Sequence, residues 1–131
     1  MVKVLIIGAT GSVGQVTRHY FLQYTTDQIT LMARHTQRLG TIDATREKVV
    51  AGSVLDATVL QTALQGQDVV FAALSGNLPK MATALIQGMT AAGVQRLLFI
   101  TSMGIYNEIP ARVGANGNLQ HNPMLQNYRE A

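Results

Sequence analysis

The sequence predicts an α/β domain in which a parallel β-sheet is covered by helices on both faces. Apolar runs typical of buried strands alternate with segments of helical periodicity, and the connections between them are short. The first apolar run leads directly into three glycines spaced three residues apart, and a helix follows. Strands and helices that alternate in this way are joined by right-handed crossovers, which produce a parallel sheet.

The first strand is expected over residues 2–7, and the glycine-rich turn follows it. Gly8 suits a turn whose backbone angles a β-carbon would obstruct. Gly11 would let the main chain approach a phosphate closely, and Gly14 would let the helix pack closely on the sheet. The N-terminus of that helix offers free N–H groups and a partial positive charge to an anion, with Ser12 as N-cap or as a phosphate donor.

A glycine pattern is informative when a strand precedes it and a helix follows it, and both are expected here. The helix carries apolar residues at helical spacing, namely Val13, Val16, Tyr20 and Tyr24. The turn therefore predicts a dinucleotide phosphate site, and the alternative is a turn of small residues without a ligand. The residues expected to contact the pyrophosphate are Gly8, Thr10, Gly11, Ser12, Val13 and Gly14.

The second strand is expected over residues 28–33 and ends at Arg34. In dinucleotide-binding folds an acidic side chain at this point accepts the adenosine ribose hydroxyls, whereas an arginine accommodates a 2′-phosphate. Arg34, with Arg38 close by, therefore favours NADP(H) over NAD(H). Arg46 and Lys48 are expected near the same phosphate. The alternative for Arg34 is a solvated side chain after a strand.

Two further helices are bounded by residues that favour helix ends. Asp56 is a good N-cap and Gly66 lies where its helix would stop, while Pro79 can take the first helical position of a helix that ends at Gly93. The buried stripes expected are Val59, Leu60, Ala63 and Leu64 in the first helix, and Met81, Leu85, Ile86 and Met89 in the second.

The remaining strands are expected over residues 48–51, 69–74 and 96–101. The run over 69–74 is apolar throughout, which indicates a strand covered on both faces. The expected strand order is 3-2-1-4-5, with the ligand crevice at the carboxyl ends of strands 1 and 4, where the order reverses. Besides the glycine turn, the residues expected at carboxyl ends are Arg34, Ser53, residues 75–78 and Ser102.

The composition fits one compact domain over residues 1–131. Because the chain has no cysteine, disulfides and thiolate metal sites are excluded, and we expect no metal. The strand at residue 2 leaves no room for a signal peptide, and no apolar run approaches the roughly 20 residues that span a bilayer. We therefore expect a cytoplasmic protein that binds no membrane.

The net charge of +3 does not indicate nucleic-acid binding. Tracking a duplex usually takes more cations along one face, with aromatic or helical groove elements beside them. A modest excess of positive charge also arises from solvated surface alone.

With all five strand exits in order, the sequence resembles the atypical short-chain dehydrogenase/reductase group, in its NmrA-like and flavin or biliverdin reductase-like branch. The matching segments are residues 8–14, 31–34, 52–56, 67–70 and 99–106. The resemblance covers residues 1 to about 108 and implies a Rossmann-type, doubly wound fold. It also implies an NADP(H) site whose pyrophosphate lies on the glycine turn.

The resemblance implies further site residues at the other strand ends. Ser53 and Val54 stand near the adenine, where the family commonly has an Asp after the third strand. The segment from Leu74 through Ser75 and Gly76 corresponds to the one that passes the nicotinamide ribose and phosphates. At the end of the fifth strand, Thr101 is an expected cofactor contact, and Ser102 matches a catalytic serine beside the nicotinamide, acting as a hydrogen-bond donor.

Reductases of the larger superfamily use a tyrosine with a lysine four residues on, which lowers the tyrosine pKa. The lysines of this chain are Lys3, Lys48 and Lys80, so no such pair exists after the fifth strand. Atypical members often lack it, and some hold cofactor and acceptor face to face for hydride transfer. Related proteins continue beyond a segment like 107–131, so we expect the substrate-binding part to be absent or incomplete here.

The leading hypothesis is an NADP(H)-dependent reductase that transfers hydride to a flavin, a quinone or a similar small acceptor. The main alternative is a non-catalytic module that senses NADP(H), as the NmrA-like resemblance allows. A methyltransferase is disfavoured, because methyltransferases generally have an acid after strand 2 where this chain has Arg34. The exposed edge of the last strand could pair with another chain, which would give a homo-oligomer.

Overall fold

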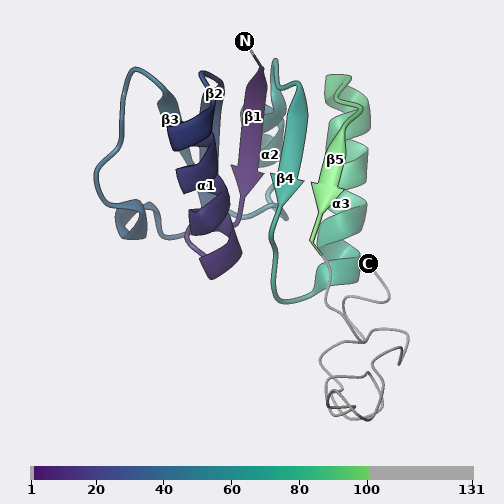
Figure 1. Cartoon of the computed structure of the whole chain (residues 1–131). Coiled ribbons are helices and arrows are strands. Elements are labelled where there is room, and N and C mark those ends of the chain that lie inside the picture. Colours follow the sequence, from purple (N-terminus) through teal and green to yellow (C-terminus); the bar gives the residue numbers. More distant parts are fainter. Residues whose placement is uncertain (1, 101–131) are drawn as a thin grey trace, which may run out of the picture.

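The computed structural model describes residues 2–100 as one five-stranded sheet with helices packed on it (Figure 1). All its strand pairs are parallel, and their order is β3-β2-β1-β4-β5. The elements in chain order are β1 (Lys3–Ile7), α1 (Ser12–Tyr24), β2 (Gln28–Ala33), the 3₁₀ helix η1 (Thr36–Leu39), β3 (Glu47–Ala51), α2 (Ala57–Leu64), β4 (Val69–Ala72), α3 (Leu78–Ala92) and β5 (Leu97–Phe99). The predicted fold class and strand order are confirmed.

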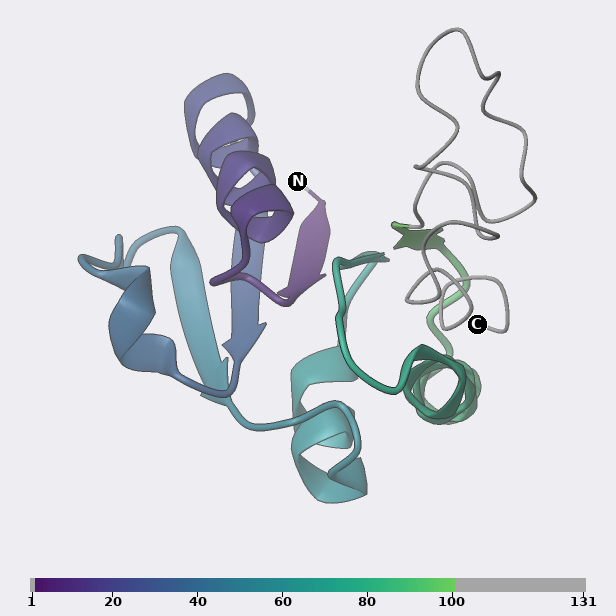
Figure 2. The same cartoon turned by 90° about the horizontal axis from the view of Figure 1, so that it is seen from below.

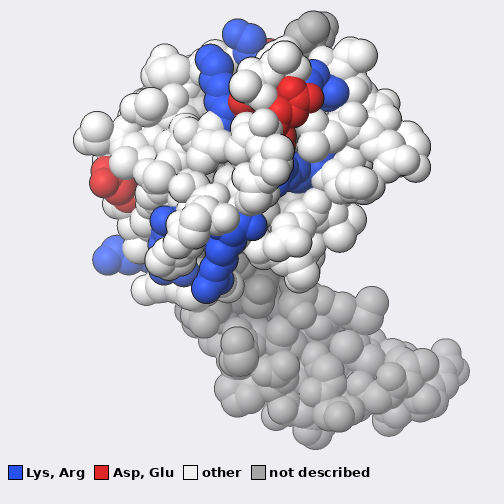
Figure 3. Space-filling model, turned by 90° about the vertical axis from the view of Figure 1, so that its left-hand side faces the viewer, with Lys and Arg blue, Asp and Glu red and all other residues white. Residues whose placement is uncertain are grey.

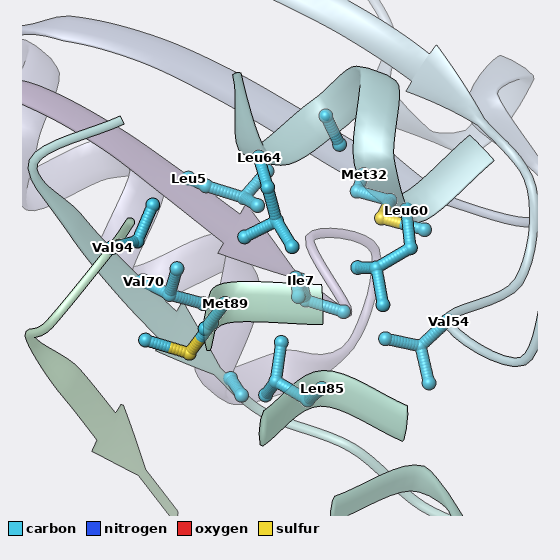
Figure 4. Close-up of a cluster of buried hydrophobic side chains, with 12 residues drawn as sticks. Leu5, Ile7, Met32, Val54, Leu60, Leu64, Val70, Leu85, Met89 and Val94 are labelled. Carbon is cyan, nitrogen blue, oxygen red and sulfur yellow. The ribbon is translucent and has the colours of Figure 1, made fainter. Parts of the chain in front are cut away.

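The two faces of the sheet are covered by different helices, as Figure 2 shows: α1 lies on one side, and α2 and α3 lie on the other. Side chains alternate between these faces along each strand, because successive residues of a strand point in opposite directions. On β1, Val4 and Ile6 belong to the core cluster under α1. Leu5 and Ile7 belong to the cluster under α2 and α3, which is drawn in Figure 4.

The apolar stripe expected on α1 does not face the sheet. Val13, Val16, Tyr20 and Tyr24 are 44%, 70%, 56% and 67% exposed. The buried residues of this helix are instead Gly14 and Thr17, with Phe21 and Leu22 packed partly against the core. The helix lies so close to β1 that only small side chains fit at its N-terminal end, and the longer apolar residues are displaced to the outer face.

The helix ends follow the sequence signals at α2 and α3. The Asp56 carboxylate accepts hydrogen bonds from the amides of Thr58 and Val59, as an N-cap should. The helix α3 ends at Gly93, which adopts φ +74°, and Pro79 is its second residue instead of its first. The expected N-cap role of Ser12 is wrong, because Ser12 is already the first residue of α1.

Two expectations about the connections and helix faces are also corrected. Ile86 is 55% exposed, and Gly88 takes its place on the inner face of α3, where a β-carbon would approach Leu60 and Leu64 to 3.0 Å. Between β2 and β3 the chain forms only the 3₁₀ helix η1, which places Leu39 in the core under α1. None of the described helices is long and apolar enough to cross a bilayer.

These burial patterns predict opposite outcomes for two apolar truncations. Leu64→Ala is expected to lower the free energy of unfolding by about 2–5 kcal/mol, because it opens a cavity in the core. Val16→Ala is expected to change it by less than about 0.5 kcal/mol, because the side chain stands in solvent. Denaturant unfolding followed by circular dichroism measures both, and a large loss in Val16→Ala would contradict the exposed position of the α1 stripe.

Candidate functional site

A cavity of about 250 Å³ opens at the carboxyl ends of β1, β2, β3 and β4. Its lining residues are Ile7, Gly8, Thr10, Gly11, Met32, Ala33, Arg34, Arg38, Gly52, Ser53, Val54, Ala73, Leu74, Ser75 and Met81. A second cavity, at the N-terminus of α1, is lined by Gly11, Ser12, Val13, Gly14, Ala73, Leu74, Ser75 and Ile100. The two share Gly11 and residues 73–75, so they form one crevice at the switch point between β1 and β4.

Two glycines of the turn are required by the fold itself. Gly8 adopts φ +80°, and a β-carbon on it would lie 1.9 Å from the carbonyl oxygen of Ala73. A β-carbon on Gly14 would lie 2.1 Å from the carbonyl oxygen of Gly8. Any larger residue at either position would force β1 apart from β4 or from α1.

Gly11 differs from both, because nothing near it in the described part of the chain excludes a side chain. Its backbone has φ −71° and ψ 167°, which any residue adopts, and its β-carbon would meet only the Gly8 carbonyl at 3.5 Å. The missing side chain instead leaves the first turn of α1 open to the crevice. This is the arrangement that a phosphate approaching backbone amides requires.

The N-terminus of α1 has no side-chain cap, in contrast to the other two α-helices. In α2 and α3, Asp56 and Asn77 supply that cap. Within residues 2–100, the amides of Ser12, Val13 and Gly14 have no hydrogen-bond acceptor. Three free donors and the positive end of the helix therefore face the crevice, and together they suit an anion.

Two arginines line the cavity beyond the carboxyl end of β2. Arg34 follows β2 directly and Arg38 lies in η1, and both are exposed and line the cavity. Among the described residues the one ion pair is between Arg18 and Glu47, so neither cavity arginine is neutralised by a carboxylate. In Figure 3, one group of basic side chains lies along the lower part of the described surface, the side on which the strands end, and other basic side chains lie at the top beside acidic ones.

Two other cations expected near this phosphate site are elsewhere. Arg46 donates to the carbonyls of Phe21, Leu22, Thr25 and Asp27, at the C-terminal end of α1. Lys48 lines a different cavity with Lys3 and Gln28, from the beginning of β1 and β2. The expectation failed because Arg46 lies just before β3 and Lys48 is its second residue, whereas the crevice lies where the strands end.

The remaining predicted residues fall into three groups. Ser53 and Val54 line the cavity after β3, with the Ser53 hydroxyl accepting from the amide of Leu55 at 3.1 Å. Leu74 and Ser75 line it after β4, whereas Gly76, at φ +107°, lines neither part of the crevice. Thr101 and Ser102 lie outside the described residues.

The structure also adds lining residues that the sequence reasoning missed. Met32 and Ala33 precede Arg34, and Ala73 follows β4, so their position at strand ends was a signal available in the sequence. Met81 belongs to α3, where it was expected only as core. No sequence pattern distinguishes a methionine that borders a cavity from one that fills a core.

A parallel sheet of this order, with a glycine turn at its switch point, defines the class of Rossmann-type dinucleotide-binding folds. Within that class the chain belongs to the NAD(P)H-binding family, whose model matches residues 8–131. The predicted family relationship is confirmed at this level. Comparison with curated proteins by sequence finds no significant match.

Several solved structures share the fold. A Rossmann-fold NAD(P)-binding family protein from Shigella flexneri is 30% identical, with a TM-score of 0.79 over 99% of this chain and 58% of its own. A short-chain dehydrogenase/reductase from Veillonella parvula, in complex with NADP, is 22% identical, with a TM-score of 0.87 over 98% and 61%. ChuY from Escherichia coli O157:H7, described as an anaerobillin reductase, is 19% identical, with a TM-score of 0.77 over 96% and 63%. The chain thus spans less than two thirds of the length of these proteins.

The different roles of the glycines give a direct test of the site. Gly11→Ala is expected to keep the free energy of unfolding within about 1 kcal/mol of the parent. It should weaken NADPH and NADH binding alike by about tenfold or more, because a methyl group then stands before the amides. Fluorescence titration with each cofactor and denaturant unfolding measure the two effects.

Gly8→Ala and Gly14→Ala serve as comparison variants. Each places a β-carbon against backbone and should lose at least about 2 kcal/mol of stability. If Gly11→Ala binds both cofactors as tightly as the parent, the turn is not the phosphate site.

Proposed function

We propose that this chain is the NADP(H)-binding part of a reductase that transfers hydride from NADPH to a flavin, a quinone or a similar small acceptor. The observation that carries the proposal is the pairing of two separate anion-binding features in one crevice. The open N-terminus of α1 suits a pyrophosphate, and the unpaired Arg34 and Arg38 suit a second phosphate. A dinucleotide with a 2′-phosphate carries both groups.

Different residues of the chain would bind different parts of the cofactor. The amides of Ser12, Val13 and Gly14 would bind the pyrophosphate, and Arg34 and Arg38 the 2′-phosphate. An arginine can give a phosphate two parallel charge-assisted hydrogen bonds, each worth roughly 1.5–3 kcal/mol. One such bond corresponds to about a tenfold gain in affinity or more, which is enough to favour NADPH over NADH.

The other predicted contacts would position the two ends of the cofactor. Ser53 and Val54 border the adenosine side of the cavity, and Leu74 and Ser75 border the side shared with α1. NADPH, when bound, supplies the hydride. Ser102 would then donate a hydrogen bond at the acceptor and hold it in place, acting without any proton transfer of its own.

The relatives support a reductase in this family. The Veillonella parvula protein is called a short-chain dehydrogenase/reductase and was crystallised with NADP, and ChuY is called an anaerobillin reductase. Since this chain spans only about 60% of the length of such proteins, we assign the choice of acceptor to a part that corresponds to their remaining residues.

One observation favours a second function, the non-catalytic sensing of NADP(H). Tyr106, which follows the fifth strand, has Pro110 four residues on, where reductases of the larger superfamily have a lysine. Titrating the full chain with NADPH and then adding flavin or quinone separates the two functions. Oxidation of the bound nicotinamide, followed by its absorbance, supports the reductase, whereas tight binding without oxidation supports the sensor.

The cofactor preference gives a sharper prediction. Arg34→Ala and Arg38→Ala should each weaken NADPH binding by about ten- to a hundredfold and leave NADH binding nearly unchanged, because only NADPH carries the 2′-phosphate. Fluorescence titration with both cofactors measures the two dissociation constants. Lys48→Ala removes an exposed cation at the other end of the sheet and is the matched control, expected to change neither constant. Equal losses for NADPH and NADH would contradict the 2′-phosphate role.

A further inference from the structure

We propose that Arg18 is a positioning residue for cofactor selectivity, because it holds the β2–β3 connection in the conformation that presents Arg38 to the cavity. This inference rests on the proposed function, in which Arg34 and Arg38 bind the 2′-phosphate. Arg18 itself does not line the cofactor cavity. It would act through the backbone at the C-terminal end of η1, and it would affect NADPH only.

The Arg18 side chain forms a clamp between α1 and the connection. Its Nε lies 2.6 Å from Glu47 Oε2 and its Nη2 lies 3.1 Å from Glu47 Oε1, so the guanidinium and carboxylate pair through two bonds. The same guanidinium donates to the carbonyls of Leu39 at 2.7 Å and Thr41 at 2.9 Å. The side chains of Arg18 and Glu47 are only 13% and 1% exposed, so this pair is shielded from water.

The two carbonyls bound by Arg18 lie on either side of Gly40. This glycine ends η1 with φ +69°, and nothing lies within 4 Å of the position of its missing β-carbon. No side chain at Gly40 packs against a neighbour, and a glycine has the widest choice of conformations. Together with the buried Leu39 side chain, the hydrogen bonds from Arg18 to Leu39 and Thr41 restrain this turn, and Arg38 is the residue just before Leu39.

Glu47 extends the same clamp to the beginning of β3. Its Oε1 also accepts from the amide of Asp43 at 3.0 Å, and its own amide donates to the Asp43 carbonyl at 2.7 Å. One buried carboxylate thus joins α1, the turn at Asp43 and the strand β3. The clamp thus fixes the connection from the last residue of η1 to the beginning of β3.

If this restraint is lost, the Arg38 side chain can occupy a second cavity. Besides the cofactor cavity, it lines a neighbouring cavity of about 340 Å³ with Arg18 and Gln15. A side chain with two open volumes beside it binds a phosphate better when its backbone is already in place, because less freedom is lost on binding. We therefore expect the clamp to increase NADPH affinity by preorganising Arg38.

The chain offers a matched control in Arg46. Its guanidinium also makes four hydrogen bonds, to the carbonyls of Phe21, Leu22, Thr25 and Asp27. These bonds brace the opposite end of α1, and Arg46 does not line the cofactor cavity. Arg46→Lys thus removes a comparable brace from the same helix without touching η1.

The decisive experiment compares Arg18→Lys with Arg46→Lys in the full chain. Lysine keeps the charge opposite Glu47, but its single nitrogen has three N–H donors and cannot reproduce the four hydrogen bonds that the planar guanidinium of Arg18 makes. We expect Arg18→Lys to lower the ratio of NADPH to NADH affinity by about three- to tenfold, with NADH binding unchanged. Arg46→Lys should leave that ratio unchanged while both variants lower the thermal unfolding temperature. Equal weakening of both cofactors in Arg18→Lys would overturn the proposal.

A double variant separates this inference from the proposed function. In an Arg38→Ala background, Arg18→Lys should cause no further loss of selectivity, and a further loss would exclude action through Arg38. If Arg38→Ala lowers the NADPH preference but Arg18→Lys does not, the inference alone fails. If neither Arg34→Ala nor Arg38→Ala lowers it, the proposed function fails. Should Arg18→Lys not fold, Glu47→Gln weakens the ion pair that holds the Arg18 guanidinium against the carbonyls of Leu39 and Thr41, and it should lower selectivity less than Arg38→Ala. An unchanged ratio of NADPH to NADH affinity in Glu47→Gln would overturn the inference.

Discussion

The close approach of α1 to the end of β1 is the constraint on which the rest of this structure depends. A β-carbon on Gly14 would lie 2.1 Å from the carbonyl oxygen of Gly8, and one on Gly8 would lie 1.9 Å from that of Ala73. Two missing side chains thus let a helix and two strands meet at one point. Because the order of the sheet reverses there, the same contact places the N-terminus of α1 in the crevice between β1 and β4.

Three positions along α1 have separate roles. Its uncapped first turn faces the crevice, Arg18 in its middle fixes the connection that carries Arg38, and Arg46 satisfies carbonyls at its last turn. Within residues 2–100, the backbone amides of the first turn have no hydrogen-bond acceptor. A glycine N-cap such as Gly11 costs a helix roughly a few tenths of a kcal/mol relative to Ser, Asn or Asp, and a bound anion would offset that cost. The asymmetry between the two ends of α1 is therefore what a ligand site at one end would produce.

The fold could be predicted largely from the sequence, because strand exits, glycine spacing and helix caps are local signals. The bounds of β2 were predicted to the residue. Asp56 caps the start of α2 and Gly93 caps the end of α3, as expected. The inner face of α1 could not be predicted, since apolar spacing does not reveal how near a helix lies to its sheet. The Arg18 clamp was also invisible, because its partners are backbone carbonyls and a carboxylate 21 to 29 residues away. Such contacts exist only after the chain has folded.

In the candidate site, the groups that would bind both cofactors lie apart from the groups that would distinguish NADPH from NADH. NADH and NADPH share a pyrophosphate, so the open turn at Gly11 and the amides of α1 can increase affinity but cannot discriminate between them. Discrimination requires a group that meets the one phosphate by which the cofactors differ, and among the described residues Arg34 and Arg38 are the cations that line the cavity. Arg34 leaves directly from β2 and is held by the sheet, whereas Arg38 lies on a short 3₁₀ helix between two loops. On the proposed function, we therefore expect the stiffness of that connection, and with it the clamp from α1, to add to the selectivity that the charge of the arginines supplies.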